Sequence, residues 1–130
     1  MKPPILQGLA KYPVREVILH CAAIRAGQFD GYTPFAVFSA VNRWHVQRGF
    51  KGFGYHGLIM PDGTFYSGRP YTQIGAHCIE RNRGTLGFLL IESAEIKALK
   101  TFRDYYTQLQ LQALNKLLRT IPGLNKVSGH

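Results

Sequence analysis

The sequence Gly-Phe-Gly-Tyr-His-Gly-Leu-Ile-Met-Pro-Asp-Gly-Thr, residues 52 to 64, decides where the first pair of strands lies. Its apolar run from Tyr55 to Met60 predicts a strand, and Pro61-Asp62-Gly63 has the composition of a tight turn. Residues 64–67 then form the returning strand. The adjacent pair Tyr55-His56 could also carry chemistry, so this stretch predicts a β-hairpin close to a functional site.

A second predicted strand lies on the N-terminal side of this hairpin. Val17, Ile18 and Leu19 form an apolar run that ends in His20-Cys21, as expected of a buried strand with a polar residue at its exit. Successive side chains of a strand point to opposite faces. His20 and Cys21 are therefore not expected to bind one metal ion together.

A helix is predicted between these two strands, from Pro34 to Gly49, where a glycine is a natural stop. Thr33 has the properties of an N-cap, and proline is favoured at the first helical position. An apolar stripe at helical spacing predicts that the helix packs on a sheet. We expect the side chains of this stripe to belong to the core rather than to a ligand-stacking surface: Phe35, Phe38, Val41 and Trp44.

The C-terminal half predicts a long loop, a central strand and a second helix. Residues 68–85 have little periodicity, and loops of this length in small domains often carry function. The continuous apolar run 86–91 is typical of a strand buried on both faces. Residues 93–106 fit a helix and an insertion loop equally well. Thr107–Gln110 has the form of a capping box that begins a helix, and residues 127–130 look like a short strand or turn.

The bulk composition describes one small globular domain with a basic surface. A chain of 130 residues fits a single domain, in which we expect residues 1–14 to form an extended and loosely packed lead-in. The 16 Lys and Arg residues against 7 Asp and Glu residues give a net charge of +9, which favours polyanionic partners. The basic residues are scattered and match no nucleic-acid-binding motif, so we expect no specific nucleic-acid partner.

The sequence also predicts where the protein is made. No segment approaches the roughly 18 consecutive apolar residues of a membrane helix, so no membrane insertion is expected. The first ten residues make a poor secretory signal because their apolar run is broken. We therefore expect the protein to be cytoplasmic when it is made, with Cys21 and Cys78 as reduced thiols.

Histidines are the main candidates for chemistry. The sequence has no nucleophile elbow, phosphate-binding loop or paired-cysteine motif, which removes the common hydrolase, nucleotide-binding and zinc-ribbon interpretations. Of the 5 histidines, His20 at a strand exit and His130 after a glycine are best placed to present rigid imidazoles to a cleft.

Short motifs from about residue 15 to the end of the sequence follow one another in a distinctive order. They are Val17–Ala22 with His20, Trp44-His45 with Gly49-Phe50, Gly54-Tyr55-His56, Asp62-Gly63-Thr64 with Gly68-Arg69, Gly75-Ala76-His77, Asn82 with Thr85-Leu86-Gly87, and Gly129-His130. No single motif is decisive, but their order and spacing resemble the N-acetylmuramoyl-L-alanine amidases. The sequence is most similar to the bacteriophage lysozyme-type amidases, or endolysins, and to the related peptidoglycan recognition proteins.

The resemblance implies a single α/β domain over residues 15–130, with a mixed central β-sheet flanked by helices. It also implies a zinc hydrolase whose partner is peptidoglycan and which acts on the cell wall after release, by cleaving the amide between N-acetylmuramic acid and L-alanine. His20 and His130 match two zinc ligands, and a catalytic zinc ion commonly takes three protein ligands and one open position.

Other residues acquire expected roles from the same resemblance. Tyr55 matches a catalytic tyrosine beside the metal, where its hydroxyl could donate to the developing oxyanion. His77 matches a groove-lining histidine, so we expect it to bind substrate, together with Asn82 and Thr85 in the loop that leads into the central strand. Two histidines are expected to be structural: His45 and His56.

The sequence departs from the family pattern after Gly129-His130. Family members continue with a lysine that aids catalysis and then a cysteine or aspartate that completes the zinc site. Leu89 stands where the cytoplasmic wall-recycling amidases have a glutamate, which favours the phage-like branch. We expect an active amidase with a longer C-terminal tail. The alternatives are an inactive peptidoglycan-binding relative, a site completed only in an assembly, and a basic nucleic-acid-binding domain.

Overall fold

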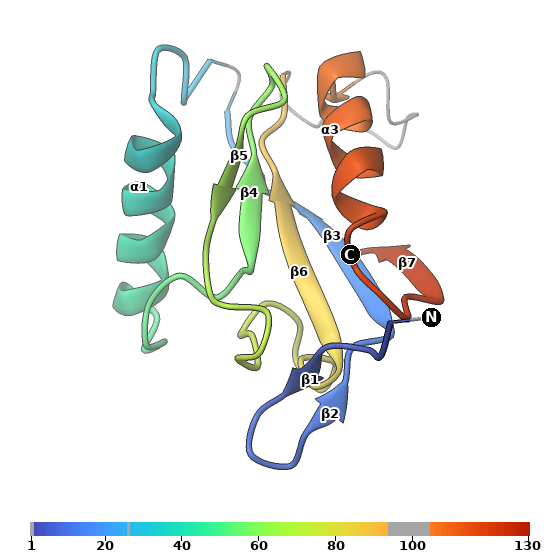
Figure 1. Ribbon diagram of the computed structural model, residues 1–130. Helices are drawn as coiled ribbons and strands as arrows, with labels where there is room; N and C mark the ends of the chain where they lie inside the picture. The colour runs from blue at the N-terminus through green and yellow to red at the C-terminus, as the bar shows by residue number, and fades with distance from the viewer. Residues whose placement is uncertain (1, 26, 94–104) are drawn as a thin grey trace.

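The computed structural model describes residues 2–25, 27–93 and 105–130, which contain a five-stranded sheet between two helices (Figure 1). Strands β5 and β4 pair antiparallel, and the other neighbouring strands pair in parallel. The predicted mixed sheet flanked by helices is therefore confirmed. The strands follow the order β5-β4-β6-β3-β7, and their bounds are β3 (Glu16–Cys21), β4 (Gly57–Ile59), β5 (Phe65–Ser67), β6 (Thr85–Leu90) and β7 (Lys126–Gly129).

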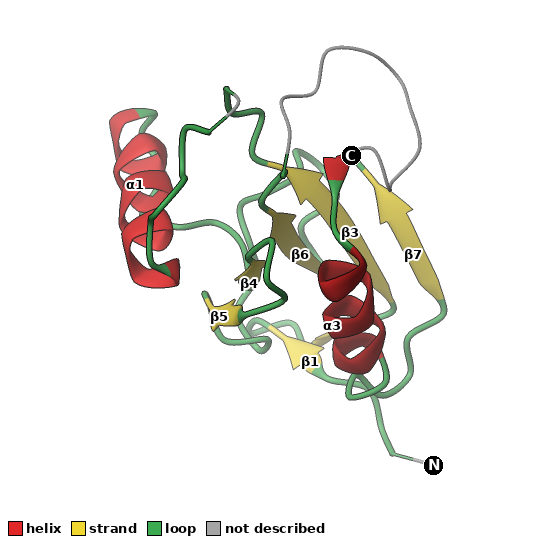
Figure 2. Ribbon diagram, turned by 90° about the horizontal axis from the view of Figure 1, so that it is seen from above, coloured by secondary structure: helices red, strands yellow, loops and turns green. Residues whose placement is uncertain are grey.

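The two helices, α1 (Pro34–Gln47) and α3 (Gln108–Leu118), lie on opposite faces of the sheet (Figure 2). Because side chains alternate along a strand, neighbouring residues of β6 pack on different layers. Leu89 belongs to a core cluster with residues of α1, whereas Leu90 packs with Leu114 of α3. The central strand is thus buried on both faces, as its apolar run predicted, and all six of its residues are buried.

The face of the sheet that is turned toward α1 carries the polar side chains. His20 of β3 lies opposite Leu89 of β6 in the parallel register, so both side chains point to the α1 side. Thr85 and Gly87 lie on that face as well, since they precede Leu89 by four and two residues in the same strand. The opposite face, covered by α3, is apolar in the described residues, with Val17, Leu86 and Phe88 in its core clusters.

Helix α1 begins where it was predicted, and its buried side matches the predicted stripe except in the first turn. The Thr33 side chain accepts a hydrogen bond from the Ala36 N–H group, as an N-cap does. However, Phe35 is 61% exposed, so its predicted place in the core is wrong. The buried residues of the helix include Val41 of the predicted stripe and are Val37, Ala40, Val41 and His45.

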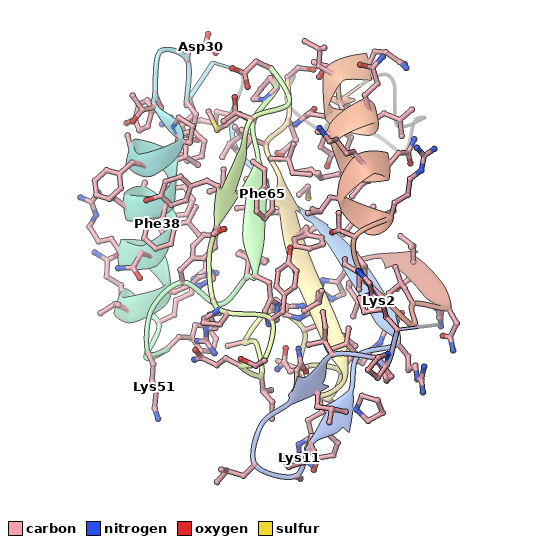
Figure 3. All side chains as sticks on the ribbon, in the orientation of Figure 1. Lys2, Lys11, Asp30, Phe38, Lys51 and Phe65 are labelled. Carbon is pink, nitrogen blue, oxygen red and sulfur yellow. The ribbon has the colours of Figure 1, made fainter. Side chains whose placement is uncertain are left out.

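The aromatic residues around the two layers fill the rest of the core. Phe38 of α1 packs against the cluster on the α1 side of the sheet, while Phe65 of β5 packs against the clusters on the α3 side (Figure 3). Trp44 is partly buried in the first of these clusters, as predicted. Only the first turn of the predicted aromatic stripe therefore lies outside the core.

The N-terminal residues are folded more tightly than expected. Strands β1 (Leu6–Gln7) and β2 (Tyr12–Pro13) form an antiparallel hairpin. Gln7 is fully buried; its amide donates to the Thr85 carbonyl oxygen at 2.8 Å and accepts from the Gly84 N–H group at 2.9 Å. The prediction of a loosely packed lead-in is wrong here, because this side chain satisfies backbone groups at the start of the central strand.

The loop between β5 and β6 is long, as predicted, and one arginine holds it in place. Arg69 donates from its guanidinium to the carbonyl oxygens of Phe53 and Ile74. The segment for which the sequence left a helix and an insertion loop open lies, for residues 94–104, outside the described residues. No helix among those described is long and apolar enough to cross a membrane.

The start of α3 joins the helix to the ends of two central strands. Thr107 and Gln110 form the predicted capping box, in which each side chain accepts from the other's backbone N–H group. Gln110 is fully buried, and its amide nitrogen also donates to the carbonyl oxygens of Ile59 and Ile91. The Gln110 side chain therefore caps the helix and donates hydrogen bonds to carbonyl oxygens at the ends of two strands.

Replacing Gln110 with alanine should lower the free energy of unfolding by about 2 kcal/mol, because two buried carbonyl oxygens lose a side-chain donor and the Thr107 N–H group loses its acceptor. Urea denaturation followed by circular dichroism measures this change. Gln112 is exposed on the same helix, so Gln112→Ala is the control and should stay within about 0.5 kcal/mol of the unmodified protein. Equal losses in the two variants would contradict the role given to Gln110.

Candidate active site

Three aromatic side chains from distant parts of the sequence lie around His20. The ring centroid of His20 lies 5.2 Å from that of Tyr55, 5.0 Å from that of His77 and 5.0 Å from that of His130. His20 is only 5% exposed. The residues that the sequence singled out for the metal and for catalysis are thus brought together, at the end of β3 where the sheet meets the α1 side.

His130 reaches His20 through the pairing of strands β3 and β7. These strands are parallel, with Glu16 opposite Lys126 and Leu19 opposite Gly129. The register continues for one more residue, because the N–H group of His130 donates to the carbonyl oxygen of Leu19 at 2.9 Å. His20 and His130 therefore lie next to each other, at the same register position of adjacent chain segments.

A charged cluster at the other end of these strands holds the register. The carboxylate of Glu16 accepts from the Arg81 guanidinium and from the Ser128 hydroxyl, and the Lys126 ammonium lies 3.9 Å away. Arg81 also donates to Ser128. Since Glu16 belongs to β3, Ser128 to β7 and Arg81 to the loop before β6, the cluster ties three segments together.

The loop that carries His77 is shaped by two of the predicted site residues. The Asn82 side-chain oxygen accepts from the N–H groups of His77 and Cys78, both at 2.9 Å. Thr85 is 5% exposed, and its hydroxyl donates to the Arg81 carbonyl oxygen at 2.7 Å. These bonds give Asn82 and Thr85 roles inside the loop; the substrate contacts that we expect of His77, Asn82 and Thr85 stay predictions.

Gly87 makes room for the His77 ring on the sheet. A Cβ atom at this position would lie 2.4 Å from Cγ of His77, well inside van der Waals contact. The imidazole can lie against β6 only because this residue has no side chain. The Thr-Leu-Gly sequence of residues 85–87 thus combines a hydroxyl that contacts His77 with the space that its ring needs.

Burial keeps the imidazoles of His20 and His77 neutral. Desolvation is the main cause that lowers the pKa of His20 to about 4, and the charges of His130 and Arg81 lower it further. Burial, followed by the neighbouring His20, lowers the pKa of His77 to about 3. Both imidazoles are therefore uncharged at neutral pH, which is the form that can offer a lone pair to a metal ion.

Tyr55 is a hydrogen-bond donor at neutral pH. Burial is the main cause that raises the pKa of its phenol, and the charge of Cys21 raises it further. The hydroxyl consequently keeps its proton and can donate to an oxygen that gains negative charge nearby.

A cavity of about 360 Å³ opens beside these residues. Tyr55 forms part of its wall, and Arg48, which is exposed at the end of α1, is its cationic side chain. Tyr55 therefore lies between the cavity and the histidine cluster. Its lining is Ala22, Ala23, Ile24, Gln28, Val41, Trp44, His45, Arg48, Tyr55 and Leu89.

Two imidazoles of this cluster are suitable ligands for a zinc ion. His20 and His130 are close and come from adjacent strands, and nitrogen ligands of this kind suit zinc. Within the described residues, no group of three or more His, Cys, Asp and Glu side chains is arranged to hold a metal ion. Cys21 and Cys78 are free thiols, and Cys21 lies on the other face of β3 from His20. Among the described residues, the side chains that suit zinc are therefore two histidines, one fewer than the three protein ligands that a catalytic zinc ion commonly takes.

Glu92 is a contributor to the site that the sequence analysis missed. Its carboxylate is 5% exposed and accepts from the N–H groups of Ala22 and Ile24. It therefore fixes the segment that directly follows His20-Cys21 and forms one side of the cavity. The signal in the sequence is an acidic residue directly after the apolar run 86–91.

The chain is similar in sequence to phage endolysins. It is 30% identical to the endolysin of Escherichia phage T7 over 105 residues, which cover 81% of this chain and 64% of that protein. It is 29% identical to the endolysin of Klebsiella phage KP32 over 113 residues, which cover 87% of this chain and 70% of that protein. The chain thus spans a little under two thirds of the length of its T7 relative. No model of a known protein family matches it.

Solved structures with the same fold are amidases and peptidoglycan recognition proteins. The endolysin N-acetylmuramoyl-L-alanine amidase LysCS from Clostridium intestinale superposes with a TM-score of 0.65 and 26% identity, covering 90% of this chain and 68% of that one. Peptidoglycan recognition protein LE, solved in complex with tracheal cytotoxin, a monomeric diaminopimelic acid-type peptidoglycan, superposes with a TM-score of 0.72 and 22% identity. That alignment covers 98% of this chain and 74% of the other, and it shows the fold alone.

His56 has the contacts expected of a structural histidine, because both of its ring nitrogens bond to backbone groups. It is fully buried; its Nε2 atom donates to the Gln73 carbonyl oxygen at 2.8 Å, and its Nδ1 atom accepts from the Gly87 N–H group at 3.1 Å. Burial is the main cause that lowers its pKa from 6.5 to about 4. Protonation would place a second N–H group against that of Gly87.

We expect the free energy of unfolding to fall as the pH drops from 6.5 to about 4, because the unfolded chain binds a proton at His56 in this range while the folded protein does not. The contribution of the neutral ring is complete above pH 6.5 and is lost below about pH 4. His56→Gln cannot titrate, so its stability should depend less steeply on pH. Urea denaturation between pH 4 and 7.5 tests this, and parallel pH profiles for the two proteins would refute it.

Proposed function

Because the chain belongs to the family of amidase-like and peptidoglycan recognition protein-like domains, we propose that it is a zinc-dependent peptidoglycan hydrolase. Its reaction would be cleavage of the amide between N-acetylmuramic acid and the L-alanine of the stem peptide. The observation that carries this proposal is the meeting of His20, His130 and Tyr55 beside a cavity.

His20 and His130 would supply two of the ligands of the zinc ion. Both project from strands whose register is fixed by backbone hydrogen bonds, so their separation is set by the fold rather than by side-chain flexibility. When bound, zinc polarises a carbonyl oxygen and lowers the pKa of a coordinated water toward neutrality.

Tyr55 would act on the oxygen of the amide that is cleaved. As the carbonyl carbon becomes tetrahedral, its oxygen gains negative charge, and a hydroxyl that is protonated and largely desolvated stabilises that charge strongly. Burial raises the pKa of Tyr55, which keeps the proton on the phenol throughout. The cavity next to Tyr55 would hold the part of the substrate on one side of the scissile bond.

The charge of the protein suits a wall polymer. With a net charge of +9, the chain is attracted to anionic surfaces, which raises its rate of encounter with anionic cell walls. Arg48 places one of these charges directly at the cavity. We propose that the protein is made in the cytoplasm and acts on the wall after release, as phage endolysins do.

Purified peptidoglycan tests the reaction directly. Incubation with the protein and zinc should release stem peptides with new free alanine amines, and a chelator should stop the release. Binding to the wall without release would instead favour a peptidoglycan-binding relative without activity, as the recognition-protein neighbours allow. The absence of both release and binding would overturn the proposal.

His20→Ala should remove zinc-dependent release and lower the amount of zinc that copurifies with the protein, because one ligand is lost. Metal content is measured by elemental analysis and release by amine labelling. Arg43→Ala is a control on the exposed surface of α1 and should retain both properties. Retained activity in His20→Ala would show that the metal assignment is wrong.

Tyr55→Phe should lower kcat about 100-fold while leaving bound zinc unchanged, since one donor to the oxyanion is lost and no ligand is touched. The comparison of kcat with metal content separates a catalytic tyrosine from a structural one. If kcat stays at the level of the unmodified protein, Tyr55 has no role in catalysis.

A further inference from the structure

We propose that Thr85, His77 and His20 form a hydrogen-bond chain that fixes the tautomer and the orientation of His20, with its Nδ1 atom left open for a ligand. His77 is then a positioning residue that acts through His20, in addition to any contact it makes with substrate. That the ligand is zinc rests on the function proposed above.

The chain of donors begins at Thr85. Its single hydroxyl proton is directed to backbone carbonyl oxygens, that of Arg81 at 2.7 Å and that of Asn82 at 3.1 Å. Toward Nε2 of His77, at 3.3 Å, the hydroxyl can therefore only accept. It follows that the proton between these two groups belongs to Nε2 of His77.

The proton position on His77 fixes the direction of its hydrogen bond with His20. A neutral imidazole carries one N–H group and one lone pair. With its proton on Nε2, His77 has a lone pair on Nδ1, which lies 3.0 Å from Nε2 of His20. His20 must then be the donor, so its own proton is on Nε2 and its Nδ1 atom is bare.

The other ring nitrogen of His20, Nδ1, has no hydrogen-bond partner among the described residues. Every fully buried polar side-chain atom among these residues has a partner. Nδ1 is consequently not sealed inside the protein. A histidine that donates one ring N–H group to a protein acceptor and leaves the other nitrogen free has the arrangement found in metal ligands.

The ring of His77 is itself held firmly enough to transmit this orientation. Its backbone N–H group is bound by Asn82, and the Cβ-free position at Gly87 leaves space for the ring against the sheet. Thr85 and Gly87 both belong to β6, and His20 to the neighbouring β3. The hydrogen-bond chain thus runs between two rigid strands through one loop residue.

Ring ¹⁵N chemical shifts of the metal-free protein test the hydrogen-bond chain itself. We expect the Nε2–H tautomer at both His20 and His77 in the unmodified protein. In His77→Phe, the signals of His20 should move toward an average of the two tautomers. An Nδ1–H tautomer at His20 in the unmodified protein would overturn the proposal, whatever the protein does with zinc.

Titration with Zn²⁺, or with Co²⁺ followed by its visible absorption, tests the consequence for binding. His77→Phe should bind either ion about 10- to 100-fold more weakly. His77→Asn should recover part of the affinity, because its side-chain oxygen can accept from His20 where Nδ1 did. The control is Arg43→Ala, on the exposed surface of α1 and outside the cavity lining, for which metal affinity should not change.

The outcomes separate the two proposals. Equal metal affinity in His77→Phe and the unmodified protein, with each variant shown to be folded by its urea denaturation curve, would overturn the positioning role. If the unmodified protein shows the expected tautomers but binds neither Zn²⁺ nor Co²⁺, the zinc function fails while the hydrogen-bond chain stands.

Discussion

The parallel pairing of β7 with β3 is the constraint on which the site depends. Parallel strands advance together, so the position of one pair of residues fixes all later pairs. Glu16, Arg81 and Ser128 lock the strands at one end, and the bond from His130 N–H to Leu19 C=O extends the same register to the other. Two imidazoles that are distant in the sequence are therefore placed side by side by backbone geometry.

Burial does two things at once in this site. It favours the uncharged form of His20, His56 and His77, and it demands that each buried ring nitrogen find a partner. His56 meets the demand with backbone groups on both nitrogens, so it has no atom left for a ligand. His20 uses a single nitrogen, against His77, and keeps the other. His56 therefore differs from His20 in having both ring nitrogens occupied, whereas His20 keeps one nitrogen available for a ligand.

The parts of the fold that sequence patterns predicted are those decided by local chemistry. The apolar run of β6, the Thr33-Pro34 helix start and the capping box of α3 all need only neighbouring residues. The predicted core position of Phe35 was wrong because the apolar stripe of α1 is longer than the part that the sheet covers, and the sequence of the helix alone does not show where that part begins. The order of the motifs predicted His20 and His130 as site residues. The hydrogen bond between His77 and His20 was not predictable, because it joins residues 57 positions apart through a loop that has no periodic pattern.

The two faces of the sheet explain how one small domain holds both a core and a cavity. On the α3 side, Leu90, Ile59 and Leu114 pack without polar interruption, and Gln110 seals the strand ends. The α1 side can then contain buried histidines and a hollow walled by small residues such as Ala22 and Ala23, since stability does not rest on that layer alone. Glu92 illustrates this division. It follows the apolar run of the central strand, and its carboxylate accepts from the N–H groups of Ala22 and Ile24, just after His20. The end of the core strand therefore also fixes one wall of the cavity.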